Sequence, residues 1–211
     1  MAAFRWIQAL AAVLLIASWA PAPLIAEDPW QTLEAARKGL VEEGATAADF
    51  VHTYKAPDFE TADQETGRLA LLLPRCLRWD YLDPDPKSVL ICEDQVYAWS
   101  PEDGAGRHYE VDPEGEAGLD LLLLPTDELK LRYRADAKDT DDGLTVITLE
   151  PVTEAQIKLG RLVIQRANSR LVALEYEDLG GGSSRFEISG YQSLTDRSLF
   201  DPPEGVEWSS P

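Results

Sequence analysis

The stretch from Gly67 to Pro101 constrains the fold most, because it places several consecutive strand patterns around the richest aromatic cluster of the chain. Within it, Leu77, Trp79 and Tyr81 alternate with charged residues. Successive side chains of a strand point to opposite faces, so this alternation puts three large apolar side chains on one face of a sheet. The pattern therefore predicts a half-buried strand whose apolar face covers an interior.

The segment 83–86, Asp-Pro-Asp-Pro, ends this strand and predicts a hairpin. Each proline lacks an amide donor and fixes its own φ, which favours a turn over a continuing strand. The apolar run 88–92 then returns as the partner strand, and a hairpin symmetric about Pro84 fixes the register. The expected cross-strand pairs are Trp79 with Val89, Leu77 with Ile91, and Cys76 with Cys92.

Cys76 and Cys92 are the two cysteines of the chain. In an exported protein an even pair favours a disulfide, and the expected register makes the two residues direct neighbours on the face opposite Trp79. Two buried free thiols are the alternative. A zinc site is disfavoured, because zinc needs four ligands and the chain adds only His52 and His108. We expect neither a metal nor a cofactor.

Residues 1–26 have the pattern of a signal peptide: one arginine, an apolar run and then small residues ending at Ala26. The apolar run from Ile7 to Ala17 is too short to span a bilayer, which takes about 20 residues. We therefore expect cleavage near Ala26, a periplasmic location, and a single domain over residues 27–211.

The formal net charge is −19 on 211 residues, of which 45% are hydrophobic. This composition is typical of a folded globular chain. Such an acidic balance argues against binding nucleic acid and against electrostatic docking on anionic lipid surfaces, since both reward basic patches. We also expect a monomer.

The remaining patterns predict a helix at 29–43, a first strand at 48–56, a second strand at 67–73, and a short buried helix or lid in the leucine-rich segment 117–124. Further antiparallel strands are expected at 96–99, 107–111, 131–137, 144–150, 159–166, 171–177 and 184–191. The glycines and asparagines between them supply turns.

No motif of an enzyme is found. His52 stands alone in a predicted strand without a nucleophile or carboxylate at a recognisable spacing, so we interpret it as a packed side chain. The acidic segment 139–143 lacks the oxygen-ligand alternation and distal glutamate of a calcium loop, and we interpret it as a hairpin turn. A catalytic function is unsupported, although a hydrolase acting on an envelope lipid stays open as an alternative.

Many antiparallel strands, one amphipathic helix and a leucine-rich segment predict a strongly curved sheet whose concave face is covered by helix, in a mainly β fold with helices. Several segments, in their order and spacing, resemble the outer-membrane lipoprotein carrier protein (LolA) family. They are Gly67-Arg68-Leu69, the run 74–81 (PRCLRWDY), the run 96–101 (VYAWSP) and the run 199–206 (LFDPPEGV).

This resemblance implies an unclosed antiparallel half-barrel with a helical lid over a hydrophobic cavity. It further implies a periplasmic carrier of lipoprotein acyl chains, with an inner-membrane lipoprotein-releasing transporter as donor and an outer-membrane acceptor. Acyl chains cost roughly 0.8 kcal/mol per CH₂ in water, which is why such cargo needs an apolar container. The residues expected to line the cavity are Leu69, Leu71, Leu77, Trp79, Tyr81, Val89, Ile91, Leu121, Leu122 and Leu124.

The sequence also departs from the family pattern. Family members often carry a basic residue before the proline of the second strand, which is thought to latch the lid, whereas Leu73 precedes Pro74 here. Arg75 and Arg78 are the candidate replacements. The cysteine pair is not a general family feature either. A half-barrel protein that senses lipidated or misfolded envelope proteins is therefore kept as an alternative function.

Overall fold

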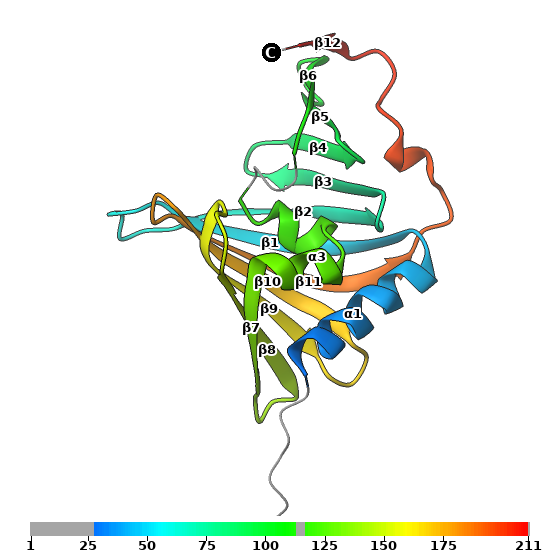
Figure 1. Ribbon diagram of the computed structural model, residues 1–211. Helices are drawn as coiled ribbons and strands as arrows, with labels where there is room; N and C mark the ends of the chain where they lie inside the picture. Colours follow the sequence, from blue (N-terminus) through cyan, green and yellow to red (C-terminus); the bar gives the residue numbers. More distant parts are fainter. Residues whose placement is uncertain (1–27, 113–116, 211) are drawn as a thin grey trace, which may run out of the picture.

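The computed structural model describes residues 28–112 and 117–210. Its core is one 12-stranded sheet, strongly curved and not closed into a barrel, with the order β12-β6-β5-β4-β3-β2-β1-β11-β10-β9-β8-β7 (Figure 1). The strands are β1 (Thr46–Lys55), β2 (Asp63–Leu72), β3 (Cys76–Asp83), β4 (Lys87–Cys92), β5 (Gln95–Ser100), β6 (Ala105–Glu110), β7 (Tyr133–Asp139), β8 (Leu144–Pro151), β9 (Ile157–Gln165), β10 (Arg170–Asp178), β11 (Ser183–Ser193) and β12 (Glu207–Ser209). The expected signal peptide, residues 1–26, lies outside the described residues.

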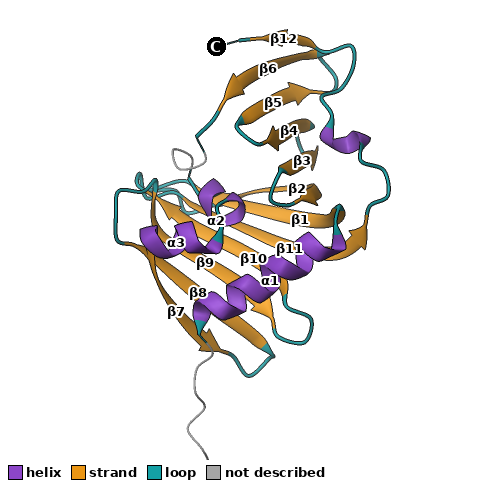
Figure 2. Ribbon diagram, turned by 45° about the vertical axis from the view of Figure 1, so that its right-hand side comes forward, coloured by secondary structure: helices purple, strands orange, loops and turns teal. Residues whose placement is uncertain are grey.

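Three helices lie on the concave side of this sheet (Figure 2). They are α1 (Pro29–Glu43), α2 (Leu119–Leu123) and α3 (Thr126–Arg132). We call α2 and α3 together the lid. The mainly β fold, the unclosed half-barrel and the helical lid expected from the sequence are thus confirmed. Among the described residues, every helix is too short or too polar to span a bilayer.

Helix α1 has the boundaries that its sequence predicts. The Asp28 carboxylate accepts a hydrogen bond from the amide of Trp30 at 3.0 Å, and Pro29 occupies the first turn, where its missing N–H costs nothing. Leu33, Ala36 and Leu40 recur at a spacing of three and four and are buried. This stripe packs the helix against the concave face of the sheet.

The central hairpin has the register predicted from symmetry about Pro84. Cys76 pairs with Cys92, Leu77 with Ile91, and Trp79 with Val89. Leu69 and Leu71 of β2 lie on the same face as Trp79 and Leu77, since Leu69 pairs with Trp79 and Leu71 with Leu77. The predicted disulfide between Cys76 and Cys92 is present.

The two faces of the sheet carry separate apolar cores. The concave face, α1 and the lid form the larger core, in which Leu77, Leu129, Ile147 and Leu149 are fully buried. The convex face holds a smaller core around Cys76, Leu90, Trp99 and Phe200. The C-terminal segment covers this second core by way of the short helix η2 (Ser198–Phe200), so the disulfide lies outside the concave interior.

Some predicted boundaries were wrong. The strand expected at 131–137 begins at Tyr133, because α3 extends to Arg132. The strand expected at 67–73 begins earlier, at Asp63, where polar residues still pair with β1. Strand β12 was not predicted; it is only three residues long and pairs in parallel with β6.

Candidate functional site

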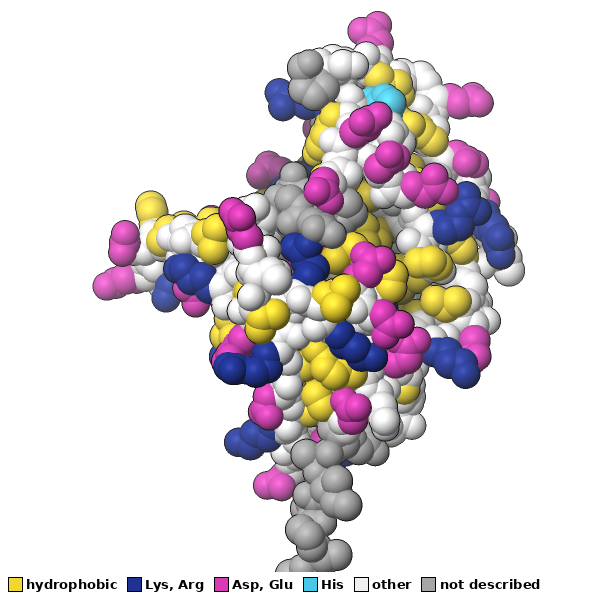
Figure 3. Space-filling view, in the orientation of Figure 1, with side chains coloured by type: hydrophobic (Ala, Val, Ile, Leu, Met, Phe, Trp, Pro, Cys, Tyr) yellow, Lys and Arg dark blue, Asp and Glu magenta, His cyan; other side chains and the backbone are white. Residues whose placement is uncertain are grey.

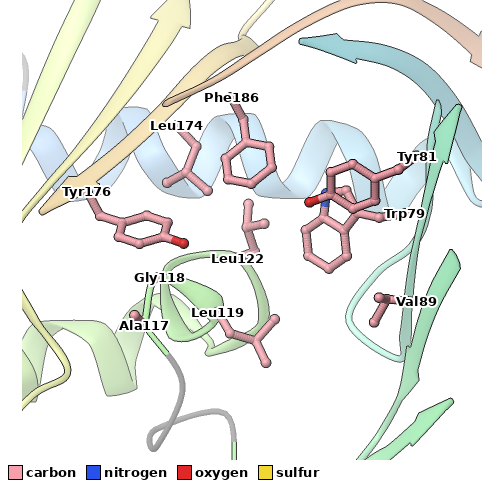
Figure 4. A pocket seen from close by; sticks show the side chains of 10 residues that line it. All are labelled: Trp79, Tyr81, Val89, Ala117, Gly118, Leu119, Leu122, Leu174, Tyr176 and Phe186. Atoms are coloured by element: carbon pink, nitrogen blue, oxygen red, sulfur yellow. The ribbon is translucent and has the colours of Figure 1, made fainter. Parts of the chain in front are cut away.

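An apolar pocket lies between the concave face of the sheet and the start of the lid. It has a volume of about 180 Å³ and is partly open to solvent. Figure 4 shows Leu122 pointing from α2 into the space in front of Leu174, Phe186 and Trp79. The lining residues come from β3, β4, β10, β11, α2 and the two residues before α2: Trp79, Tyr81, Val89, Ala117, Gly118, Leu119, Leu122, Leu174, Tyr176 and Phe186.

The strand pairing explains why these side chains meet. Trp79 and Val89 are cross-strand neighbours on the concave face, and Phe186 pairs with Leu174 on the other half of the sheet. Curvature of the sheet turns the two halves toward each other, and the ring centroids of Trp79 and Phe186 lie 6.5 Å apart. The pocket is therefore a junction between residues more than 100 positions apart in the chain.

Four of the ten residues expected to line a cavity do line this pocket: Trp79, Tyr81, Val89 and Leu122. The other six belong to the larger core: Leu69, Leu71, Leu77, Ile91, Leu121 and Leu124. Leu77 has 0% and Leu121 has 1% of its surface exposed, because α1 and the lid pack directly on these positions. They form the packing beneath the pocket rather than its wall.

Sequence reasoning missed the wall contributed by β10 and β11, namely Leu174, Tyr176 and Phe186. Their period-two alternation is visible in the sequence, as is that of Trp79 and Tyr81. What the alternation does not reveal is that β1 pairs with β11, the contact that brings the C-terminal half of the sheet beside the N-terminal half. The alternation in β10 and β11 was visible in the sequence, but the strand that pairs with β11 could not be identified from it.

One end of the pocket is polar. The Glu65 carboxylate lies 2.5 Å from Nζ of Lys87 and 3.4 Å from Nδ1 of His52. Lys87 also lies 4.5 Å above the ring of Tyr81, and the His52 ring stacks on Phe186 with centroids 4.1 Å apart. Both aromatic partners line the pocket, so this cluster forms its polar boundary.

Burial shifts the pKa values of Tyr81 and His52. It raises the pKa of Tyr81 far above its ordinary value, and Glu65 raises it further, so the hydroxyl stays neutral. Burial also lowers the pKa of His52, with Glu65 opposing the effect. At neutral pH the histidine is therefore uncharged, in keeping with the packed role expected for it.

The lid is held from α1. Nη1 of Arg37 donates a hydrogen bond to the carbonyl oxygen of Leu121 at 3.3 Å. The replacements expected for the family latch were wrong. Arg75 is largely exposed and pairs with Glu93, while Arg78 lies on the convex face, where it contacts Asp80 and the Leu199 carbonyl. Residue 78 alternates with Leu77 and Trp79, so its side chain points away from the lid.

Asp120 fixes the lid from inside. Its carboxylate is almost fully buried and accepts hydrogen bonds from the Tyr133 hydroxyl and the Leu121 amide. Nε of Arg132 lies 3.9 Å away. Burial raises the pKa of Asp120, against the effect of these partners. A network of this kind joins α2 to the end of α3 and the start of β7.

An open, curved sheet with a separate lid and an apolar pocket between them is an arrangement suited to binding an apolar ligand. The chain belongs to the family of the outer membrane lipoprotein carrier protein LolA, whose model matches residues 44–202. No curated protein matches the chain in sequence.

Solved structures share the fold at low sequence identity. An uncharacterized conserved protein from Thermus thermophilus has a TM-score of 0.55 at 13% identity, covering 86% of this chain and 98% of that chain. A DUF1329 family protein from Desulfovibrio piger has a TM-score of 0.50 at 8% identity, with coverages of 82% and 95%. These similarities concern the fold alone.

Proposed function

We propose that this protein is an exported carrier that encloses acyl chains of lipoproteins, or of related envelope lipids, between its sheet and its lid. The observation that carries the proposal is the pocket itself. Its wall is made of aromatic and aliphatic side chains from both halves of the sheet, and a side chain of the lid, Leu122, points into it. Family membership supports the same function.

The chemistry of the pocket suits a cargo that must later be released. Apolar burial is non-directional and scales with area, at about 25 cal/mol per Å². A chain held in this way can pass to an acceptor that buries more of its surface, and no covalent step is needed. The proposed role is thus binding and transfer.

Cargo larger than the closed pocket needs the lid to move. The core residues beneath the lid, among them Leu69, Leu71 and Leu77, are aliphatic and lie on the same concave face as Trp79. Displacement of α2 would extend the pocket over these side chains and would break the hydrogen bond between Asp120 and Tyr133. In this proposal the larger cavity expected from the sequence forms when the lid opens, and the pocket seen in the structure is its closed form.

Mass spectrometry of lipid that co-purifies with the full chain from an envelope extract tests the function. We expect acylated lipoprotein or diacyl lipid, bound in about equal amount to protein and lost from the Trp79→Glu variant. Recovery of a membrane signalling protein without any lipid would favour the sensor alternative instead. Release of free fatty acid from the bound lipid over time would indicate a hydrolase.

A further inference from the structure

Three neighbouring connections of the sheet form one edge of the molecule, which we call the hairpin edge. They are residues 56–62 between β1 and β2, 152–156 between β8 and β9, and 179–182 between β10 and β11. Antiparallel pairing of β11 with β1 and of β10 with β9 brings them together. A Cβ placed on Gly181 would lie 3.7 Å from Cβ of Pro57 and 3.8 Å from Nζ of Lys158. Figure 1 shows the β1–β2 and β10–β11 connections projecting side by side at its left.

Each of these connections exposes one large apolar side chain. Phe59 is 65%, Val152 60% and Leu179 57% exposed. One exposed apolar side chain is ordinary on a protein surface, but here three occur on adjacent loops. Among the described residues, the connections at the opposite end of the sheet, β2–β3, β4–β5, β7–β8 and β9–β10, expose none. The exposed apolar surface of the loops is therefore concentrated at the hairpin edge.

Unpaired carboxylates accompany the apolar tips. Asp58 and Glu60 flank Phe59, and Glu154 follows Val152 by two residues. All three acidic side chains are exposed, and none makes an ion pair or a side-chain hydrogen bond within residues 28–112 and 117–210. Their charge is therefore available to an outside partner.

The cations near this edge do not offset its negative charge. Nζ of Lys158 lies 3.0 Å from the Glu177 carboxylate, and Arg134 is paired with Glu150. Lys55, at the end of β1, is exposed and has no such partner within the described part of the chain. Across residues 55–62, 151–158 and 177–183 the sequence holds five carboxylates and two lysines. The hairpin edge is therefore acidic as well as apolar.

This combination selects among the occupants that such an edge could bind. The carboxylates would be repelled by an anionic lipid surface, and a second copy of this chain in a symmetric contact would bring the same charges against them. Insertion of the tips into a bilayer would also dehydrate the carboxylates that flank Phe59. A protein surface with apolar hollows bordered by lysine or arginine suits both features, because the tips fill the hollows while the charges pair at the rim.

We infer that the hairpin edge is a docking surface for a basic protein partner whose contact face has apolar hollows. The edge lies beside the apolar pocket, since Tyr176, which lines the pocket, is three residues before Leu179 near the end of β10. A partner bound at the edge is next to that wall of the pocket. The inference goes beyond the proposed carrier function, because lipid binding itself does not require this partner.

Site-specific photo-cross-linking with the full chain, expressed in the cell envelope, tests the inference. Benzoylphenylalanine replaces Phe59 in one form of the protein and Leu179 in a second form. The matched control carries the same residue in place of Val41, an exposed apolar side chain on α1. We expect a protein cross-link from positions 59 and 179 but not from position 41, and we expect the cross-linked peptide of the partner to contain lysine or arginine beside apolar residues.

Two further changes, made in the form that carries the cross-linker at position 179, separate charge from apolar contact. Asp58→Asn with Glu60→Gln should lower the cross-linking yield about fivefold, as the loss of two exposed ion pairs implies. Asp141→Asn with Asp142→Asn removes the same charge from the β7–β8 turn at the other end of the sheet and should leave the yield unchanged. Phe59→Ser should lower the yield at least about tenfold, because it removes a large buried contact, whereas Val41→Ser should not.

Cross-links to lipid, to a second copy of this chain or to no molecule at positions 59 and 179 would overturn the inference. Equal yields from position 41, or equal losses in the two charge variants, would overturn it as well. Phe59→Ser should bind a fluorescent fatty acid as tightly as the native chain, and a loss of that binding would assign the edge to the lipid site instead. Failure of the native chain to bind the fatty acid would overturn the carrier function, while the cross-links would still decide the docking surface.

Discussion

Arg37 of α1 donates a hydrogen bond to the backbone carbonyl of Leu121 in the lid. The side chain of Arg37 thereby contacts a backbone atom of α2. The contact depends on the position of α2 and not on the side chain at residue 121. The half-buried guanidinium makes it a charge-assisted bond, worth about 1.5 kcal/mol.

Replacing this guanidinium should loosen the lid. Arg37→Met keeps an unbranched apolar stem but loses the donor, and we expect release of a bound fluorescent fatty acid to quicken by about tenfold, as a loss near 1.4 kcal/mol implies. Stopped-flow displacement measures this rate. Lys38→Met is the control, since Lys38 is an exposed neighbour on α1 that pairs with Glu42 and does not hold the lid. Equal rates in both variants would refute the role of Arg37.

A charge in the pocket should abolish uptake. In Trp79→Glu the carboxylate must either lose its hydration, at a cost of several kcal/mol, or take up a proton, so acyl-chain affinity should fall at least a hundredfold. Leu82→Glu places the same charge on the exposed convex side of strand β3, where 58% of the leucine surface is accessible. Unchanged binding by a folded Trp79→Glu protein would mean that the chains lie elsewhere.

Gly118, at the entrance to α2, permits a close approach between the lid and Tyr176. Its φ is +76°, and an added Cβ would lie 2.5 Å from the tyrosine ring. Gly118→Ala should therefore lower the unfolding free energy by about 1–3 kcal/mol through strain and overpacking. In α1, Gly39→Ala has open space and should instead add about 0.5–1 kcal/mol through helix propensity. Chemical denaturation compares the unfolding free energies of the two variants. An unchanged unfolding free energy in Gly118→Ala would contradict the close contact with Tyr176.

The disulfide should contribute to stability on the convex side of the hairpin. Cys76 and Cys92 are 16 residues apart, and a loop of that length implies about 3 kcal/mol on the chain-entropy model. The double variant Cys76→Ser, Cys92→Ser should lose that amount in guanidinium denaturation, and reductant should destabilise the native protein but not the variant. Alkylation in denaturant without reductant should add no label. Two added labels would disprove the bond.

Stability should depend on pH through His52. Burial holds its folded pKa below the ordinary value, so the folded state binds a proton less readily than the unfolded chain. The contribution is complete above about pH 6.5 and is lost as the pH falls below it toward the lowered folded value. His52→Gln should flatten this part of the stability profile between pH 7.5 and 5, whereas His108→Gln should retain it. Parallel profiles for the native protein and His52→Gln would rule the histidine out.

The central hairpin shows most clearly how much of the fold can be predicted from the sequence. Two prolines in the turn and a strict alternation defined its register down to the cysteine pair, because local rules act over a few residues. The amphipathic spacing and capping residues of α1 defined its bounds in the same way.

The site was predictable from the hairpin and from the leucine-rich segment, but not from the C-terminal half of the sheet. Trp79, Tyr81 and Val89 were found because they belong to the hairpin, whereas Phe186 and Tyr176 depend on β1 pairing with β11, a contact that closes a long loop. Arg37 as the lid contact was likewise missed, since nothing local to α1 tells which backbone carbonyl its side chain will meet. Hydrophobic side chains gather at the centre of the helix-bearing face, and only the assembled molecule shows that some of them surround a pocket (Figure 3).

The covering helices occupy a particular place in the chain order. The segment with α2 and α3 leaves the N-terminal half of the sheet at β6 and enters the C-terminal half at β7, which is an edge strand. The covering helices thus join the two halves of the sheet along the chain. A change in the curvature of the sheet would change the distance between the end of β6 and the start of β7. A ligand that spreads the strands would in this way act on the position of the lid.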